Sequence, residues 1–316
     1  MTLKMNEHMD IRKVVSNFLE KNIPQYDSIL IGCRADDDIN VHACCEYNII
    51  ALRDLEATPQ SLLYFDAFEG NNRKYKQTFQ VRILSAKQLH INNFIKYSDF
   101  EYFPGKFLKS TEFNHFREKN DNMRKTFRFE IRRDVFDSVY NLTFLLNYLS
   151  KQVLDEKTIS FELKMVSLKT LRNYIHFYLG KEHRPSHLKN QINSVIQTES
   201  IKIRECIDKI LEFIGMHKAN ISTLLRSEKS LDLLMRNVQS PTKKLILNKV
   251  EFLKEKSMYV DGIFLIYNYL LDNFQGQEQK TSYQQLLRRT ADIDNKDKMT
   301  LQKEIGLLIE YNKLLI

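Results

Sequence analysis

The stretch SILIGCRADDDINVHACCEYNIIAL, residues 28–52, places two short apolar runs on either side of a polar segment. The first run, from Ser28 to Ile31, has the length of a β-strand and ends in Gly32. The second run continues from Tyr47 to Leu52, and its apolar character is typical of a buried strand. A glycine at the end of the first run allows a sharp backbone turn. The stretch therefore predicts two strands whose polar connection begins with a glycine turn.

The segments on both sides of these strands predict a small mixed unit. Residues 9–21 carry apolar side chains at three- and four-residue spacing, which predicts an amphipathic helix ended by Pro24. Residues 62–68 and 78–84 are two further strand-like runs, and the residues between them include Gly70, Asn71 and Asn72, a strong turn signal. These two runs predict a hairpin. Helix, strand, strand and hairpin together indicate an α/β unit.

Beyond residue 130 the apolar residues follow the period of a helix. Val135, Val139 and Leu142 step by four and three residues, which places them on one helical face. Further helices are expected at residues 158–179, 186–195, 200–214, 219–236, 242–256, 260–274, 282–289 and 298–315, and Gly180 has the position of a C-terminal cap. The sequence thus predicts an α+β protein, with a mixed α/β domain at residues 1–130 and an all-helical domain at residues 131–316.

Residues 97–133 are rich in Arg and Lys and support two interpretations. One is a solvated linker with a strand at residues 126–131. The other is a phosphate-facing surface between the two domains. The sequence does not assign the segment to either domain.

The composition excludes several classes of protein. With 43% apolar and 28% charged residues among 316, the chain is neither disordered nor a collagen-like or disulfide scaffold. It has no run of 18 apolar residues and no apolar segment near its N-terminus, which predicts a protein without a membrane span or a secretory signal. The four cysteines are too few and too unevenly placed for a disulfide framework, so we expect a cytoplasmic protein. The net charge of +8 is a modest excess, compatible with phosphate-bearing partners.

The ordered set of helix, strand, glycine turn and second strand resembles a known enzyme signature. Gly32, Cys33, Arg34 and Ala35 follow the first strand, and Glu46, Tyr47 and Asn48 open the second. Over residues 9–90 this pattern is similar to the nucleotidyltransferase superfamily, which includes DNA polymerase β and the aminoglycoside nucleotidyltransferases. Family members often carry a helical bundle after the catalytic unit.

The resemblance assigns roles to individual residues. It implies that Gly32, Cys33 and Arg34 bind the phosphates of a nucleotide, because a glycine turn brings backbone N–H groups close to them. Glu46 and Asn48 fall on two catalytic positions, and Glu46 is the expected metal ligand. The implied cofactors are Mg²⁺ and a nucleoside triphosphate.

The sequence departs from the family pattern where the chemistry would occur. Cys33 stands where serine is expected, and a thiol is the weaker donor. Asn48 replaces an acid with a neutral amide. For the third carboxylate the best candidate strand is at residues 78–84, where Gln80 and Arg82 are the outward-facing candidates. One carboxylate of three would remain, so we expect a catalytically degenerate protein that binds a nucleotide or an RNA phosphate.

Two alternatives stay open. An active magnesium-dependent nucleotidyltransferase would transfer a nucleoside monophosphate to a hydroxyl of a small molecule, a protein or RNA. Its metal ligands would be Glu46 with one of Asp36, Asp37, Asp38, Asp66 or Glu69. The second alternative is a module that binds a protein partner through its helices.

Two further groups of residues were weighed as candidate sites. Cys33, His42, Cys44 and Cys45 match no usual zinc-ligand spacing, so we expect no metal there. In the helical domain, a basic patch is either a solvated helix junction or one wall of a cleft. It comprises Arg172, Asn173, Tyr174, His183, Arg184, Pro185, Ser186, His187 and Lys189.

Overall fold

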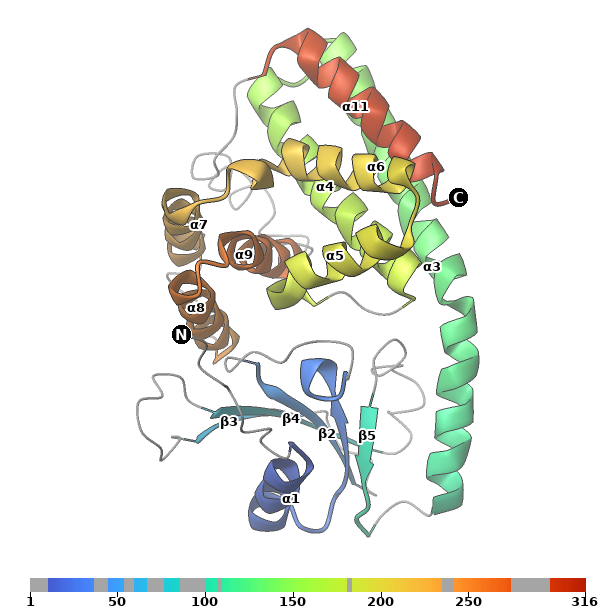
Figure 1. The fold of residues 1–316 in the computed structure, drawn as a ribbon, viewed down its shortest axis with the longest axis vertical. Coiled ribbons are helices and arrows are strands. Elements are labelled where there is room, and N and C mark those ends of the chain that lie inside the picture. The colour runs from blue at the N-terminus through green and yellow to red at the C-terminus, as the bar shows by residue number, and fades with distance from the viewer. Residues whose placement is uncertain are drawn as a thin grey trace. The chain divides into compact units, whose positions relative to one another are not determined.

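The computed structural model describes residues 11–36, 45–53, 60–66, 77–85, 100–106, 110–180, 184–234, 241–273 and 296–316. Over these residues the protein is of mixed α/β class, with a small mixed sheet and predominantly helical structure (Figure 1). The chain divides into two compact units, residues 1–124 and 125–316. Among the described helices, none is long and apolar enough to cross a membrane. The expected turn at residues 70–72 and the expected helix at residues 282–289 lie outside the described residues.

The first unit contains a five-stranded sheet in the order β3-β4-β2-β1-β5. The strands are β1 (Asp27–Ile31), β2 (Tyr47–Arg53), β3 (Gln60–Asp66), β4 (Gln77–Ser85) and β5 (Phe100–Phe103). β2 and β4 are parallel, and the other neighbouring pairs are antiparallel. The two strands predicted at residues 28–31 and 47–52 are confirmed. The antiparallel pairing of β3 with β4 confirms that the strand-like runs predicted at residues 62–68 and 78–84 pair as the two strands of a hairpin do.

Helix α1 (Ile11–Asn22) packs on one face of this sheet (Figure 1). Its apolar stripe, which includes Val15, Phe18 and Leu19, joins a core cluster with side chains of β1, β2 and β4. Phe79 of β4 stacks between two rings, with centroid distances of 3.9 Å to Phe18 and 4.7 Å to Tyr47. Stacked aromatic pairs add about 0.5–1.5 kcal/mol each beyond the area they bury. The alternation of β2 and β4 thus directs Tyr47 and Phe79 into the core beneath α1.

A fully buried carboxylate fixes the edge strand β5 to β1. Asp27 begins β1, and one of its oxygens accepts hydrogen bonds from the Tyr102 hydroxyl and, at 2.8 Å, from the backbone N–H of Gly105. Burial and the Asp27 carboxylate raise the pKa of Tyr102 well above its usual range. The chain at Gly105 passes so close to β1 that a Cβ there would lie 2.3 Å from the backbone nitrogen of Asp27. Glycine is therefore required at position 105, because any side chain would clash with the backbone of Asp27.

The described elements after β5 are helical. They are α3 (Ser110–Ser150), α4 (Glu156–Leu179), α5 (Leu188–Thr198), α6 (Ile201–Ile214), α7 (Ile221–Leu234), α8 (Pro241–Glu255), α9 (Tyr259–Asn273) and α11 (Lys298–Lys313), with 3-10 turns η2 (Pro185–His187) and η3 (Met216–Lys218). Gly180 caps α4 with a φ of +66°, as predicted. Within the second unit α4 packs against α6 and α11, and α9 packs against α7 and α8 (Figure 1).

The prediction of a linker with a strand at residues 126–131 is wrong. Residues 110–150 form one continuous helix, α3, of 41 residues. The alternation of Phe127, Phe129 and Ile131 imitates a strand, but no Gly or Pro occurs between residues 106 and 179. Without a breaker, the helix that is clearly periodic after residue 133 extends backwards through the basic segment.

Candidate functional site

The turn after β1 has the backbone conformation that the sequence predicts. Gly32 has a φ of +85° and opens the 3-10 turn η1 (Gly32–Arg34), which the backbone N–H of Ala35 closes onto the Gly32 carbonyl at 3.0 Å. A positive φ costs a residue with a side chain about 1–2 kcal/mol, so glycine is favoured here. A Cβ at position 32 would also lie 3.1 Å from Nδ2 of Asn48. The turn therefore lies directly against the start of β2.

The two residues at the expected catalytic positions contact each other. Nδ2 of Asn48 donates to Oε1 of Glu46 at 3.3 Å. Both residues are half-buried, whereas Tyr47 between them is fully buried. Asn48 pairs with Ile31 on β1 and with Gln80 on β4. The structure thus brings Gly32, Glu46 and Asn48 together at one end of the sheet.

Arg34 is held by the polypeptide itself. Its Nε and Nη2 atoms donate to the Cys45 carbonyl at 3.2 and 2.9 Å. Its guanidinium carbon lies 4.5 Å from the ring centroid of Tyr47, a cation–π contact. A guanidinium has five N–H donors, and these bonds use two of them. Among the described residues no other hydrogen bond of Arg34 is found, so three donors remain for a ligand.

The strand expected to supply a third carboxylate, β4, carries no acid. β4 runs parallel to β2, with Asn48 beside Gln80 and Ile50 beside Arg82. Phe79, Val81 and Ile83 point into the core, as predicted, so Gln80 and Arg82 lie on the opposite side of the strand. An amide and a guanidinium donate hydrogen bonds, and a guanidinium cannot be a metal ligand. The positions on β2 and β4 where the family pattern expects acids thus hold Asn48 with Gln80 and Arg82.

The acidic residues of the active-enzyme alternative are only partly described. Asp36 is buried, at 3% exposure, at the end of the turn. Asp37, Asp38 and Glu69 lie outside the described residues, as do His42 and Cys44. Asp66 ends β3, where it pairs with Gln77.

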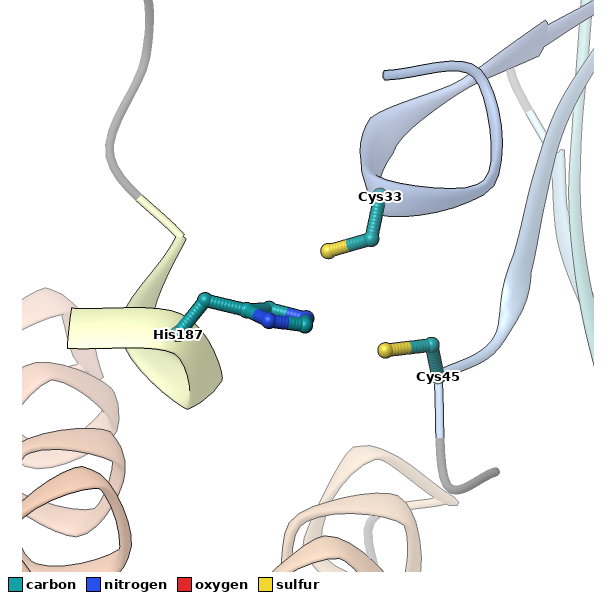
Figure 2. Close-up of side chains that lie close together, drawn as sticks. All are labelled: Cys33, Cys45 and His187. Atoms are coloured by element: carbon teal, nitrogen blue, oxygen red, sulfur yellow. The ribbon is translucent and has the colours of Figure 1, made fainter. Parts of the chain in front are cut away.

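Cys33 and Cys45, two of the four residues that the sequence analysis set aside as a metal site, form a thiol pair at the turn. Their Sγ atoms lie within 4.8 Å of each other, and Figure 2 shows both side chains directed to the same side, from η1 and from the residue before Glu46. Neither forms a disulfide. Thiols this close can share a soft metal ion or oxidise to a disulfide. The eleven residues between them match no usual ligand spacing, so only the folded turn reveals the pair.

The basic patch predicted in the helical domain is a hydrogen-bonded helix junction within the second unit. The backbone N–H of Arg184 donates to Oε1 of Gln191 at 2.7 Å, and that of Lys189 donates to Oδ1 of Asp261 at 3.0 Å. Burial raises the pKa of Asp261 to about 6, although the backbone donors oppose the shift. Burial, together with the nearby guanidinium groups of Arg172 and Arg184, lowers the pKa of His176 to about 3. His176 is therefore neutral at physiological pH.

Comparisons with known proteins assign no family to this chain. No family model matches the sequence, and no curated protein is significantly similar to it.

Proposed function

We propose that the first unit is a nucleotidyltransferase-like domain, in a cytoplasmic protein, that binds a phosphate of a nucleotide or of RNA at the Gly32-Cys33-Arg34 turn without catalysing transfer. The helical second unit then corresponds to the helical bundle that often follows the catalytic unit in that superfamily. The observation that carries the proposal is the replacement of metal-binding acids by hydrogen-bond donors. Asn48, Gln80 and Arg82 occupy β2 and β4 where two-ion catalysis would need carboxylates.

The turn supports phosphate binding in two ways. Gly32 in the left-handed conformation exposes its backbone to close approach by a ligand. Arg34 is fixed by the Cys45 carbonyl and the Tyr47 ring, so little side-chain entropy would be lost on binding. Its three remaining donors suit a phosphate, which guanidinium groups often bind through two parallel hydrogen bonds.

The first test is calorimetric titration of the whole chain with ATP, GTP, CTP and UTP, each with and without Mg²⁺. Binding that is independent of Mg²⁺ supports the proposal. Binding that strictly requires Mg²⁺ contradicts the inference that the catalytic metal sites are lost, and it favours the active enzyme. Absence of any binding overturns the proposal and favours a helical module for a protein partner.

Arg34→Ala tests the role of the turn. We expect weaker nucleotide binding by about 1–3 kcal/mol, the range for a charge-assisted hydrogen bond. Arg12→Ala is the control, because Arg12 also lies over a ring, 5.9 Å from the centroid of Phe103, but on the exposed face of α1, where it forms an ion pair with Glu101. Melting temperatures are measured for both variants. Nucleotide affinity that survives Arg34→Ala while stability falls would assign Arg34 a purely structural role.

A further inference from the structure

The thiols of Cys33 and Cys45 meet where the turn after β1 approaches the start of β2. Cys33 is the middle residue of η1, and Cys45 comes two residues before β2. Their Sγ atoms lie within 4.8 Å of each other, and both side chains point to the same side (Figure 2). The sulfur atoms of a disulfide are about 2.05 Å apart, so a bond needs an approach of at most about 2.8 Å. Rotation of the two side chains about their Cα–Cβ bonds moves the sulfur atoms by distances of this order.

The backbone beside both thiols is held by contacts within the first unit. The guanidinium group of Arg34, the residue after Cys33, donates to the Cys45 carbonyl at 3.2 and 2.9 Å. Ile31, before the turn, pairs with Asn48 on β2. These contacts join the residues around one cysteine to the residues around the other. The thiols are therefore close because of the fold of the turn, and a bond between them would add to contacts that already exist.

The two thiols differ in their access to solvent. Cys33 is half-buried, whereas Cys45 is 4% exposed. A small oxidant in solution therefore meets the Cys33 thiol first. The thiolate of Cys33 can attack one sulfur of a dissolved disulfide, which forms a mixed disulfide and releases one thiolate. The thiolate of Cys45 then attacks Sγ of Cys33 and releases the second thiolate.

We propose that Cys33 and Cys45 form a reversible disulfide, with a low-molecular-weight disulfide such as oxidised glutathione as the oxidant. The protein loses two electrons and two protons, and the oxidant becomes two molecules of reduced thiol. A disulfide needs only these two residues, whereas a structural zinc ion takes four ligands. The turn that carries Arg34 then has a reduced form and an oxidised form, which is covalently joined to the start of β2. This chemistry does not depend on phosphate binding at the turn.

The test is incubation of the full chain with mixtures of oxidised and reduced glutathione, in the presence of EDTA. The remaining thiols are alkylated with iodoacetamide, and mass spectrometry of the intact chain and of its peptides identifies the cysteines that are joined. We expect a disulfide between Cys33 and Cys45 within one chain, which an excess of reduced glutathione removes. Alkylation of every cysteine in all mixtures overturns the proposal, as does a disulfide that joins two chains or uses another cysteine.

Variants locate the bond. Cys33→Ser and Cys45→Ala should each abolish the disulfide. Cys33→Ser exchanges sulfur for oxygen at a half-buried position, so it decides the result if Cys45→Ala fails to fold. Cys44→Ser is the matched control, because it removes the neighbouring thiol in the sequence and leaves the proposed pair intact. A disulfide that is lost in Cys44→Ser and kept in Cys45→Ala would refute the assignment.

A comparison with the unfolded chain tests whether the fold positions the pair. Two thiols that are held close together have a higher effective concentration than the same thiols in an unfolded chain. Native Cys44→Ser protein should therefore be half oxidised at a ratio of oxidised to reduced glutathione at least about tenfold lower than the same protein in concentrated urea. A smaller difference, or one of opposite sign, would show that the fold does not position these thiols for a bond.

Discussion

Asp261 makes the stability of the protein depend on pH in a direction opposite to that of most carboxylates. The residue lies in the first turn of α9, is fully buried, and binds the backbone N–H of Lys189 at the start of α5. Within the described residues its Oδ2 atom has no hydrogen-bond partner. Burial of the charged form raises its pKa from 3.8 to about 6. The folded protein therefore binds this proton more tightly than the unfolded chain does.

The sign and size of the effect follow from this difference. Because the folded pKa is the higher one, the contribution is fully present below about pH 4 and is lost as the pH rises through 6. At about 1.4 kcal/mol for each pH unit, a difference of about two units corresponds to about 3 kcal/mol. Asp261→Asn keeps the carbonyl oxygen for Lys189 and removes the titration. We expect the variant to be more stable than the natural protein at pH 8 by up to about 3 kcal/mol.

The assay is urea unfolding of both proteins between pH 4 and pH 8, followed by far-ultraviolet circular dichroism. Other carboxylates titrate in this range, so the informative quantity is the difference between the two unfolding free energies at each pH. Asp208→Asn, at an exposed position on α6, is the control for the effect of replacing an aspartate with an asparagine. A difference for Asp261→Asn that does not change between pH 4 and pH 8 would refute the assignment of a raised pKa.

Two glycines give further predictions. Gly105→Ala should prevent β5 from pairing with β1 and strongly destabilise the first unit, because the new Cβ would lie 2.3 Å from the backbone nitrogen of Asp27. Hydrogen exchange of the backbone amides of β1 and β5 should then become faster. Unchanged exchange rates would contradict the steric argument. Gly32→Ala should cost about 1–2 kcal/mol of stability, since its φ is +85°, and should weaken nucleotide binding in calorimetry. Gly306→Ala in α11 is the control for both, because a Cβ there meets no atom within 4 Å and should stabilise the helix by about 0.5–1 kcal/mol.

Local sequence patterns predict most elements of this fold. The continuous apolar run of β2 and the alternation of Phe79, Val81 and Ile83 on β4 reflect burial directly, so both strands are predicted within a few residues. The C-terminal cap of α4 was also predicted correctly, because Gly180 takes the left-handed conformation that ends this helix. The first half of α3 was missed because its apolar residues are sparse among many charged ones, and because the alternation of Phe127, Phe129 and Ile131 imitates a strand.

The contacts of the candidate site were less predictable. The left-handed turn at Gly32 follows from a glycine at a strand end, a local signal. In contrast, the bonds from Arg34 to the Cys45 carbonyl and the approach of Cys33 to Cys45 join residues 11 and 12 positions apart. Asp27 and Tyr102 are 75 positions apart. Such contacts depend on how strands are placed in the sheet, which no spacing of residue types in one sequence encodes.

The late arrival of β5 has a consequence for synthesis of the chain on the ribosome. β1 is synthesised early, and β2 can pair with one of its edges soon afterwards. The other edge of β1 stays unpaired until Phe100–Phe103, which form β5, have been synthesised. Until then, the apolar strand Asp27–Ile31 presents unpaired backbone groups, the kind of edge that recruits strands from other molecules. The nascent protein should therefore depend most on chaperones during this interval, and fragments that end before Phe100 should aggregate where longer fragments remain dispersed.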